Sequence, residues 1–137
     1  MNELVCLWIC VTCRLSMEPG VAPAITTDGR ELFDLAGLLL DEHAAARLVS
    51  VRPVECMSGC NHSCTVALSA PGKPSYLFGD LEPTPEHAGA ALDCALMYAT
   101  RPDGLLPRIE RPSALRKGIL SRIPTLPQPV TQESSTP

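Results

Sequence analysis

Two pairs of cysteines constrain the fold of this chain more than any other feature of its sequence. Each pair begins where a strand-like segment ends, the first at the end of the apolar residues 3–10 and the second just after the alternating residues 48–55. The paired residues are Cys10, Cys13, Cys56 and Cys60. If the two strands are parallel neighbours, both pairs lie at the same edge of the sheet and can meet in space.

The segments between and after these strands predict how the chain reaches this arrangement. A helix capped by Asp28 is expected between the two strands, so the crossover should be right-handed and the strands parallel. Residues 65–69 and 75–78 predict a hairpin, and a second helix is expected to begin after Thr84, its N-cap. The order β-α-β-β-β-α is the minimal order of a thioredoxin-like α/β sandwich.

Three regions of the chain differ in composition. Residues 1–100 are predicted to form the thioredoxin-like domain that binds a metal or cluster, and residues 101–124 a basic C-terminal extension. Within the extension, residues 112–124 predict a short helix capped by Ser113. Its anchoring side chains would be Leu115, Ile119 and Ile123. The Pro-rich tail 125–137 has little to bury, so we expect it to be partly disordered.

The distribution of charge argues against one class of partner. The net charge is −4, so the chain as a whole is not expected to bind nucleic acid. Residues 1–100 hold 12 acidic and five basic side chains, whereas residues 101–122 hold six basic and two acidic ones. This basic segment is either a solvated tail or a strap that docks an acidic protein partner.

Seven cysteines are many for 137 residues, and they bear on the compartment. The N-terminus lacks a basic segment, and its apolar run is too short to span a bilayer, so we expect a cytoplasmic protein without a membrane anchor. In a reducing cytosol, clustered cysteines are more often metal ligands or redox groups than disulfides.

Four thiolates presented from two loops suit either a [2Fe–2S] cluster or a tetrahedral zinc ion. The spacing of the two pairs does not choose between them. Cys64 follows the second pair closely and is equally compatible with a metal ligand and with a small core residue.

Other cysteines and histidines are better explained by packing or by the loops they occupy. Cys6 lies too far along the first strand to share a metal, and Cys94 borders the apolar face of the second helix. His62 is predicted to be an ordinary loop residue, with ligation or a hydrogen bond to sulfur as the alternative. His43 is expected to interact with the carbonyl groups at the end of the first helix, and His87 to be exposed to solvent.

Three stretches around these cysteines resemble a known family. ICVTCR (9–14) resembles the first-ligand motif of thioredoxin-like [2Fe–2S] ferredoxins, ECMSGC (55–60) resembles their second ligand pair, and SAPGKPSYLFG (69–79) is similar to the hairpin that follows. Over residues 4–124 the chain resembles, more closely, a group of bacterial predicted metal-binding proteins of uncharacterised function in that superfamily. Members of this group are often linked to cobalamin and cobalt-handling genes.

The resemblance implies a [2Fe–2S] cluster and a ligand set. The ligands that it implies most directly are Cys10, Cys56 and Cys60. The chain departs from the ferredoxin pattern, because residues 14–55 contain no cysteine. Cys13 would then be the fourth ligand, or Cys64 would complete the set.

Together these observations predict a small cytoplasmic metal-binding protein, a ferredoxin-like electron carrier with a protein redox partner. The alternative is a zinc- or cobalt-binding protein that stores the metal or delivers it to an acceptor protein. A third alternative is a dithiol redox module at Cys10 and Cys13, but a long loop separates these residues from the helix that would activate them. The sequence has no hydrolase elbow, Gly-rich phosphate loop or H-E-x-x-H motif, so we do not expect an enzyme.

Overall fold

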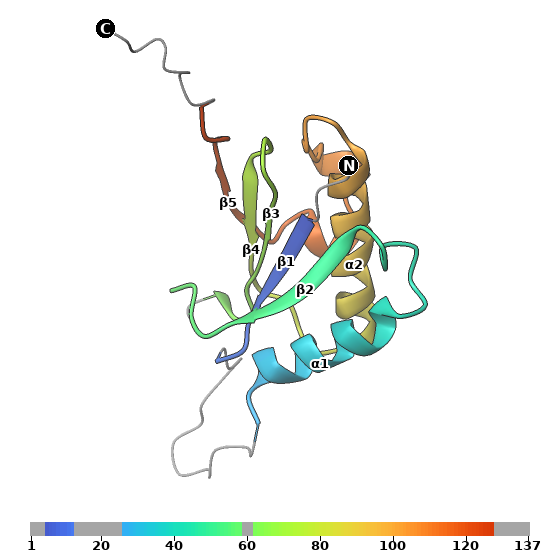
Figure 1. Cartoon of the computed structure of the whole chain (residues 1–137). Coiled ribbons are helices and arrows are strands. Elements are labelled where there is room, and N and C mark those ends of the chain that lie inside the picture. The colour runs from blue at the N-terminus through green and yellow to red at the C-terminus, as the bar shows by residue number, and fades with distance from the viewer. Residues whose placement is uncertain (1–4, 13–25, 59–61, 128–137) are drawn as a thin grey trace, which may run out of the picture.

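The structure is a computed structural model that describes residues 5–12, 26–58 and 62–127. These residues form a five-stranded sheet in the order β2-β1-β3-β4-β5, together with two α-helices (Figure 1). The strands are β1 (Val5–Cys10), β2 (Val49–Val54), β3 (Val66–Ser69), β4 (Ser75–Phe78) and β5 (Ile119–Ile123). The helices are α1 (Asp28–Leu40) and α2 (Pro85–Thr100), and two short 3-10 turns are η2 (Arg108–Glu110) and η3 (Ser113–Leu115).

The predicted order of the first six elements is confirmed, and so is the parallel crossover. β1 and β2 are parallel, with Cys10 opposite Val54, and β3 runs antiparallel to β1 on its other side. The end of β1, the end of β2 and the start of β3 therefore meet at one edge of the sheet. We call this part of the molecule the cysteine edge; it comprises residues 10–12, 55–58 and 62–65, together with Asp80.

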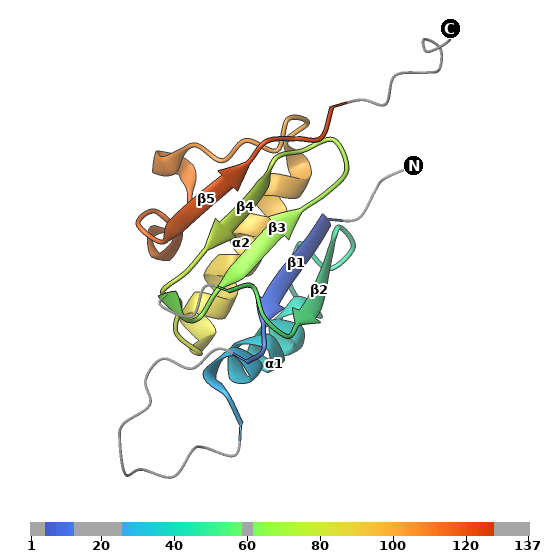
Figure 2. The same cartoon turned by 90° about the vertical axis from the view of Figure 1, so that its left-hand side faces the viewer.

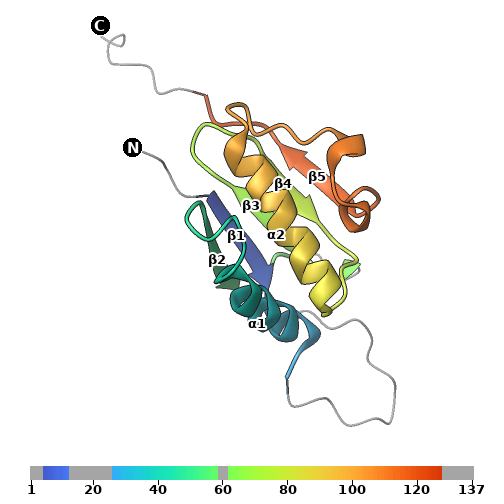
Figure 3. The ribbon, with the colours of Figure 1, turned by 90° about the vertical axis from the view of Figure 1, so that its right-hand side faces the viewer.

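Both helices lie on the same face of the sheet, so the fold has two layers (Figures 1 and 3). Alternate strand residues, such as Leu7 and Leu68, are buried beneath the helices, because strand side chains point to opposite faces in turn. α2 contributes the fully buried Leu92 to this core. The other face of the sheet carries no helix of the described part of the chain (Figure 2), and Cys6 and Trp8 of β1 are half-buried.

The starts of both helices follow from their capping residues. Thr84 caps α2 as predicted, and its hydroxyl accepts from the backbone N–H of His87 at 3.2 Å. α1 is capped by Thr27 and not by Asp28, since the Thr27 hydroxyl accepts from the N–H of Arg30 at 3.0 Å. Thr27 has the extended backbone of an N-cap, whereas Asp28 is already helical and its carboxylate favours the positive end of the helix dipole. Neither of these helices, nor any other in the described segments, is long and apolar enough to cross a bilayer.

The prediction of a helix at residues 112–124 is wrong. The first residues of this segment form only the 3-10 turn η3, and Ile119–Ile123 form β5, which pairs antiparallel with β4. Gly118 permits this pairing: its carbonyl accepts from the N–H of Gly79 at 2.7 Å, and a Cβ atom on it would lie 2.6 Å from the Gly79 carbonyl oxygen. The unpaired edge of β4, distant in the sequence, thus outweighs the local helical pattern.

The basic extension is fixed to the domain by a buried arginine. Arg111 is only 5% exposed; its guanidinium donates to the carbonyls of Leu106 at 3.1 Å and Arg116 at 3.4 Å and lies over the Phe78 ring. Arg101 forms an ion pair within the same segment, and the Arg116 side chain donates to main-chain carbonyls. Three of the six basic side chains of the predicted docking strap are therefore used inside the fold.

β5 joins residues 119–123 to the sheet, so the sheet includes residues on both sides of the boundary predicted at residue 100. The short segment 124–127 continues beyond β5 with exposed side chains. Residues 128–137, most of the tail that was predicted to be disordered, lie outside the described residues.

Candidate metal centre

Cys10 ends β1 at the cysteine edge and is held from both sides. Its backbone N–H donates to the Thr65 carbonyl at 3.1 Å, and the N–H of Val11 donates to the Val54 carbonyl at 2.9 Å. Cys10 is 1% exposed. The main chain of this cysteine is therefore fixed by its neighbours on both flanks, which is what a preorganised ligand position needs.

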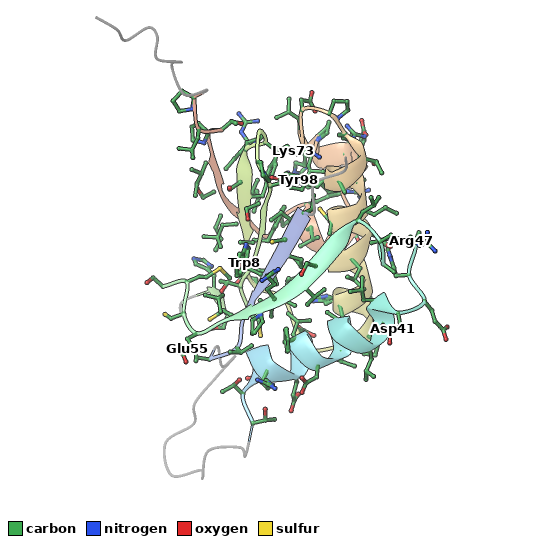
Figure 4. The ribbon with its side chains drawn as sticks, in the orientation of Figure 1. Trp8, Asp41, Arg47, Glu55, Lys73 and Tyr98 are labelled. Atoms are coloured by element: carbon green, nitrogen blue, oxygen red, sulfur yellow. The ribbon has the colours of Figure 1, made fainter. Side chains whose placement is uncertain are left out.

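The sulfur of Cys10 lies among oxygen atoms. Its Sγ is 3.5 Å from the hydroxyl oxygen of Thr12 and 3.8 Å from the carbonyl oxygen of Glu55. The Thr12 hydroxyl itself donates to that Glu55 carbonyl. Glu55 lies just beyond β2, at the lower left of Figure 4 and below Trp8. One small polar cluster thus joins the end of β1 to the residue that precedes Cys56.

Cys56 is exposed and is a free thiol. The backbone N–H of Ser58 donates to its Sγ at 3.2 Å. Ser58 has a φ of 59°, a left-handed conformation that non-glycine residues adopt rarely. Such N–H groups stabilise thiolate ligands and tune the metals they bind. The described part of this loop therefore has the form of a ligand loop.

Cys64 lies at the same edge but in a different environment. It is fully buried and belongs to the hydrophobic core. Its N–H donates to the Leu81 carbonyl at 2.9 Å, and its carbonyl accepts from the Leu81 N–H at 3.2 Å. The residue therefore has the burial of a core cysteine but lies at the edge where the predicted ligands meet.

Two of the four predicted ligands, Cys13 and Cys60, lie outside the described residues. Within residues 5–12, 26–58 and 62–127, no group of three His, Cys, Asp or Glu side chains is arranged to hold a metal ion. The described half of the candidate centre thus consists of Cys10 and Cys56, which adjoin neighbouring strand ends. The complete ligand set remains a prediction from the sequence.

His62 has a partner that the sequence did not suggest. Its Nδ1 lies 3.2 Å from the Oδ2 of Asp80, and its carbonyl accepts from the Asp80 N–H at 2.6 Å. The main chain of His62 leaves no space for a side chain at Gly79, the residue before Asp80, because a Cβ atom there would lie 2.7 Å from the His62 carbonyl oxygen. A glycine directly after a strand was the available signal for this close approach, since only glycine fits such a position.

The other two histidines differ from expectation. The side chain of His43 does not use the carbonyls at the end of α1: its Nε2 lies 2.7 Å from the Oδ1 of Asp93, and its Nδ1 accepts from the N–H of Ala45 at 2.9 Å. The packing of α1 against α2 brings Asp93 within reach. His87 is half-buried rather than exposed, and its Nδ1 accepts from the N–H of Glu82 at 2.9 Å.

Cys94 and Cys6 lie away from the cysteine edge. Burial raises the pKa of the Cys94 thiol from 9.0 to about 12, while the charge of Arg111 opposes this rise and that of Asp93 adds to it. Cys94 is thus a neutral core residue, as predicted. Cys6 is half-buried and lines a groove of about 410 Å³ between the β3–β4 turn and the chain beyond β5.

The N-terminus of α1 returns to the end of β1. The hydroxyl of Thr27, which caps α1, donates to the carbonyl of Val11, the residue after Cys10. The start of α1 therefore lies beside the residue that follows Cys10, although a long stretch of sequence separates the two. The positive end of the α1 dipole lies at the cysteine edge, where a negative charge is favoured.

Comparisons with known proteins agree with this fold. No curated protein matches the sequence. A solved structure, that of a thioredoxin-like [2Fe–2S] ferredoxin from Aquifex aeolicus, is similar with a TM-score of 0.55 and 17% sequence identity, over 88% of this chain and 94% of that chain. The fold is therefore thioredoxin-like. Residues 7–125 match the family described as "Protein of unknown function (DUF1636)", and the chain belongs to that family.

Proposed function

We propose that this protein holds a [2Fe–2S] cluster and carries single electrons to or from a protein partner. The observation that supports this most is the meeting of two cysteine-bearing strand ends, because Cys10 closes β1 and Cys56 follows β2, its parallel neighbour. The fold is shared with a [2Fe–2S] ferredoxin. The sequence resemblance around both cysteines points in the same direction.

The donor set fits such a cluster, because thiolate sulfur is the ligand that iron–sulfur clusters take. The proposed ligands are Cys10, Cys13, Cys56 and Cys60, with Cys64 as the alternative fourth ligand. The N–H of Ser58, 3.2 Å from the sulfur of Cys56, would remain as a donor to that ligand. When bound, a [2Fe–2S] cluster would supply one-electron oxidation and reduction.

The two described cysteines would have different tasks. Cys10 is buried and held by the main chain of its neighbours, so it would fix the centre and exclude water on that side. Cys56 is exposed, so it would leave the other side open to a docking protein. These thiolates must stay reduced, and we therefore propose a cytoplasmic protein.

The exposure of Cys56 also favours a second candidate function, in which the protein stores zinc or cobalt or delivers it to an acceptor protein. A ligand open to solvent can be exchanged for a ligand of the acceptor, which a closed structural site does not allow. A dithiol redox module is the third candidate, since the N-terminus of α1 lies beside Val11. In each case the protein is a carrier, and we propose no catalytic site.

Anaerobic purification followed by metal, sulfide and absorption measurements tests the proposal. A cluster protein should contain about two iron and two sulfide ions per chain and show a colour that dithionite bleaches reversibly, with a paramagnetic reduced state. A colourless protein with a single zinc or cobalt ion, unable to take up iron and sulfide, would support the metal carrier instead. A metal-free protein that forms a reversible disulfide between Cys10 and Cys13 would support the dithiol module.

A further inference from the structure

We propose that Thr12 is a positioning residue for the metal centre. Its hydroxyl donates to the Glu55 carbonyl in this structure and, we infer, turns to the Cys10 sulfur when that sulfur becomes a metal-bound thiolate. The inference rests on the proposed function, in which Cys10 is a ligand. It gives a role to a residue that is not itself a predicted ligand.

Three groups share two hydrogen atoms at this point of the cysteine edge. The Cys10 thiol and the Thr12 hydroxyl each bring one hydrogen, whereas the Glu55 carbonyl only accepts. The hydroxyl donates to Glu55. The sulfur lies 3.5 Å from the Thr12 hydroxyl oxygen and 3.8 Å from the Glu55 carbonyl oxygen, so the thiol can donate to either. Both hydrogens are therefore used while Cys10 is a thiol.

Metal binding removes one of these hydrogens. As a ligand, Cys10 would give its thiol proton to the buffer, and an electron pair of its sulfur would be shared with the metal. The sulfur is then only an acceptor, and the nearby Glu55 oxygen carries the same sign of partial charge. The Thr12 hydroxyl can reach the sulfur by rotating its hydrogen, because its oxygen is already 3.5 Å away.

This rotation would connect the two described ligands. Glu55 directly precedes Cys56, and its carbonyl loses the hydroxyl donor when Thr12 turns to Cys10. Glu55 and Thr12 are both exposed, so water can replace the lost donor. The hydrogen bond from Thr12 to Glu55 is exchanged for one from Thr12 to Cys10 and one from water to Glu55, so the net cost in free energy is small. The start of the Cys56 loop is thus tied to β1 in the free protein and released when Cys10 binds metal.

Binding of Co²⁺ to the full chain under anaerobic conditions tests this role, because cobalt thiolates show a sulfur-to-metal charge-transfer band. The dissociation constant and the energy of the band are measured for the wild type, Thr12→Val and Thr12→Ser. Quenching of Trp8, the only tryptophan, gives an independent measure of binding. Thr100→Val is the control, since it also removes an exposed hydroxyl that donates to a carbonyl, that of Met97, but at the end of α2 away from the cysteine edge. The same variants are reconstituted with iron and sulfide.

Thr12→Val keeps the branched shape and removes the donor. We expect its dissociation constant for Co²⁺ to rise at least about tenfold and its charge-transfer band to move to lower energy. Thr12→Ser should restore both values. Thr100→Val should leave both the dissociation constant and the band unchanged. If circular dichroism shows that Thr12→Val folds poorly, Thr12→Ala provides the same comparison.

Three outcomes would overturn the inference. If the wild type gives no charge-transfer band with Co²⁺ and none after reconstitution with iron and sulfide, the proposed function fails as well. If the wild type binds and Thr12→Val matches it in affinity and band energy, Thr12 is no donor and the proposed function survives. A weaker affinity with an unchanged band would make Thr12 only a structural tie between β1 and Glu55.

Discussion

The two ends of the sheet are built in different ways. At the end opposite the cysteine edge, polar groups are paired inside the fold: the Nζ of Lys73 donates to the carbonyls of Tyr98 at 2.7 Å and Ala99 at 3.1 Å. The Tyr98 hydroxyl donates to the Pro74 carbonyl at 2.6 Å. Figure 4 shows Lys73 and Tyr98 in the upper part of the molecule and Glu55 at the lower left. The upper end thus joins the β3–β4 turn to the last turn of α2.

Burial controls ionisation at this upper end. It raises the pKa of Tyr98 from 10.0 to about 12, and the neighbouring Tyr76 adds to the rise. It lowers the pKa of Lys73, an effect that Asp103 opposes. The last turn of α2 contains no basic residue, so the Lys73 ammonium supplies the positive charge that a helix C-terminus favours.

The cysteine edge has the opposite character. Cys56 and Glu55 are exposed, and Ser58 and Asp80 adopt left-handed backbone conformations. Conformations of this kind concentrate where chains bind ligands. The comparison teaches that polar side chains are paired inside the fold at one end, whereas Glu55 and Cys56 are left exposed at the other, where we propose the metal centre. Stability and metal binding should therefore respond to different substitutions.

The largest expected effect is the loss of metal from the cysteine edge. Cys10→Ser, Cys56→Ser and Cys60→Ser should each abolish stoichiometric binding, because water replaces a lost thiolate poorly. Since Cys56 is exposed, its serine variant should keep the free energy of unfolding of the metal-free protein within about 0.5 kcal/mol. Metal content and urea unfolding are measured, with Cys6→Ala as a control that keeps its metal. Full metal content in Cys56→Ser would remove that residue from the ligand set.

A smaller effect sharpens the comparison within the edge itself. We expect Cys13→Ser to weaken metal binding at least about tenfold more than Cys64→Ser. Cys64 is fully buried, so its serine variant should instead lower the free energy of unfolding by about 1–3 kcal/mol. Titration with metal and urea unfolding separate the two effects. The reverse order of affinities would make Cys64 the fourth ligand.

At the upper end, the effect should fall on stability alone. Tyr98→Phe removes the donor to the buried Pro74 carbonyl, so the free energy of unfolding should fall by about 1–3 kcal/mol while the metal content stays unchanged. Thr100→Val is the matched control, because it removes an exposed hydroxyl of the same helix and should cost less than about 0.5 kcal/mol. A loss of metal in Tyr98→Phe would show that the two ends are coupled.

The smallest effect concerns alkaline pH and the core between the two ends. The pKa of Cys94 is about 12 in the folded protein and 9.0 without burial, so the folded state keeps a proton that the unfolded chain loses. The contribution of this proton to the free energy of unfolding is complete below pH 9 and disappears as the pH rises towards 12. The free energy of unfolding should have fallen by about 1 kcal/mol by about pH 10. Unfolding of Cys94→Ala, measured at several pH values, should show a shallower decline than that of the wild type. If the free energy of unfolding declined equally with pH in both proteins, Cys94 would not be the source of this pH dependence.

Local patterns were sufficient for most of the elements that build the cysteine edge. The apolar run 3–10 predicted β1, the alternation of residues 48–55 predicted β2, and residues 75–78 were predicted with the bounds of β4. Thr84 was recognised as a cap because its oxygen meets an N–H three residues away. The helical crossover between them then predicted that β1 and β2 are parallel, which placed Cys10 and Cys56 at one edge.

Side-chain partners at the candidate centre could not be predicted in the same way. His62 meets Asp80 across 18 positions, and Thr12 meets Glu55 across 43. Each contact exists because a strand or turn brings the two residues together, and neither residue type by itself specifies the other. The sequence indicated that cysteines meet at this edge, but not which oxygen and nitrogen atoms surround their sulfurs.

The C-terminal extension shows where a local pattern was overruled. The spacing of Leu115, Ile119 and Ile123 favours a helix, and a helix satisfies its own backbone groups within the segment. Here the unpaired edge of β4 offers those partners instead, and burial of Arg111 against Phe78 holds the preceding turns in place. Periodicity along the chain was therefore sufficient to predict the helices α1 and α2 and the strands β1 to β4 themselves. The crossover was sufficient to predict the pairing of β1 with β2. Packing between distant segments determined β5 and the groups around the sulfurs, because their energy comes from contacts that no short stretch of sequence contains.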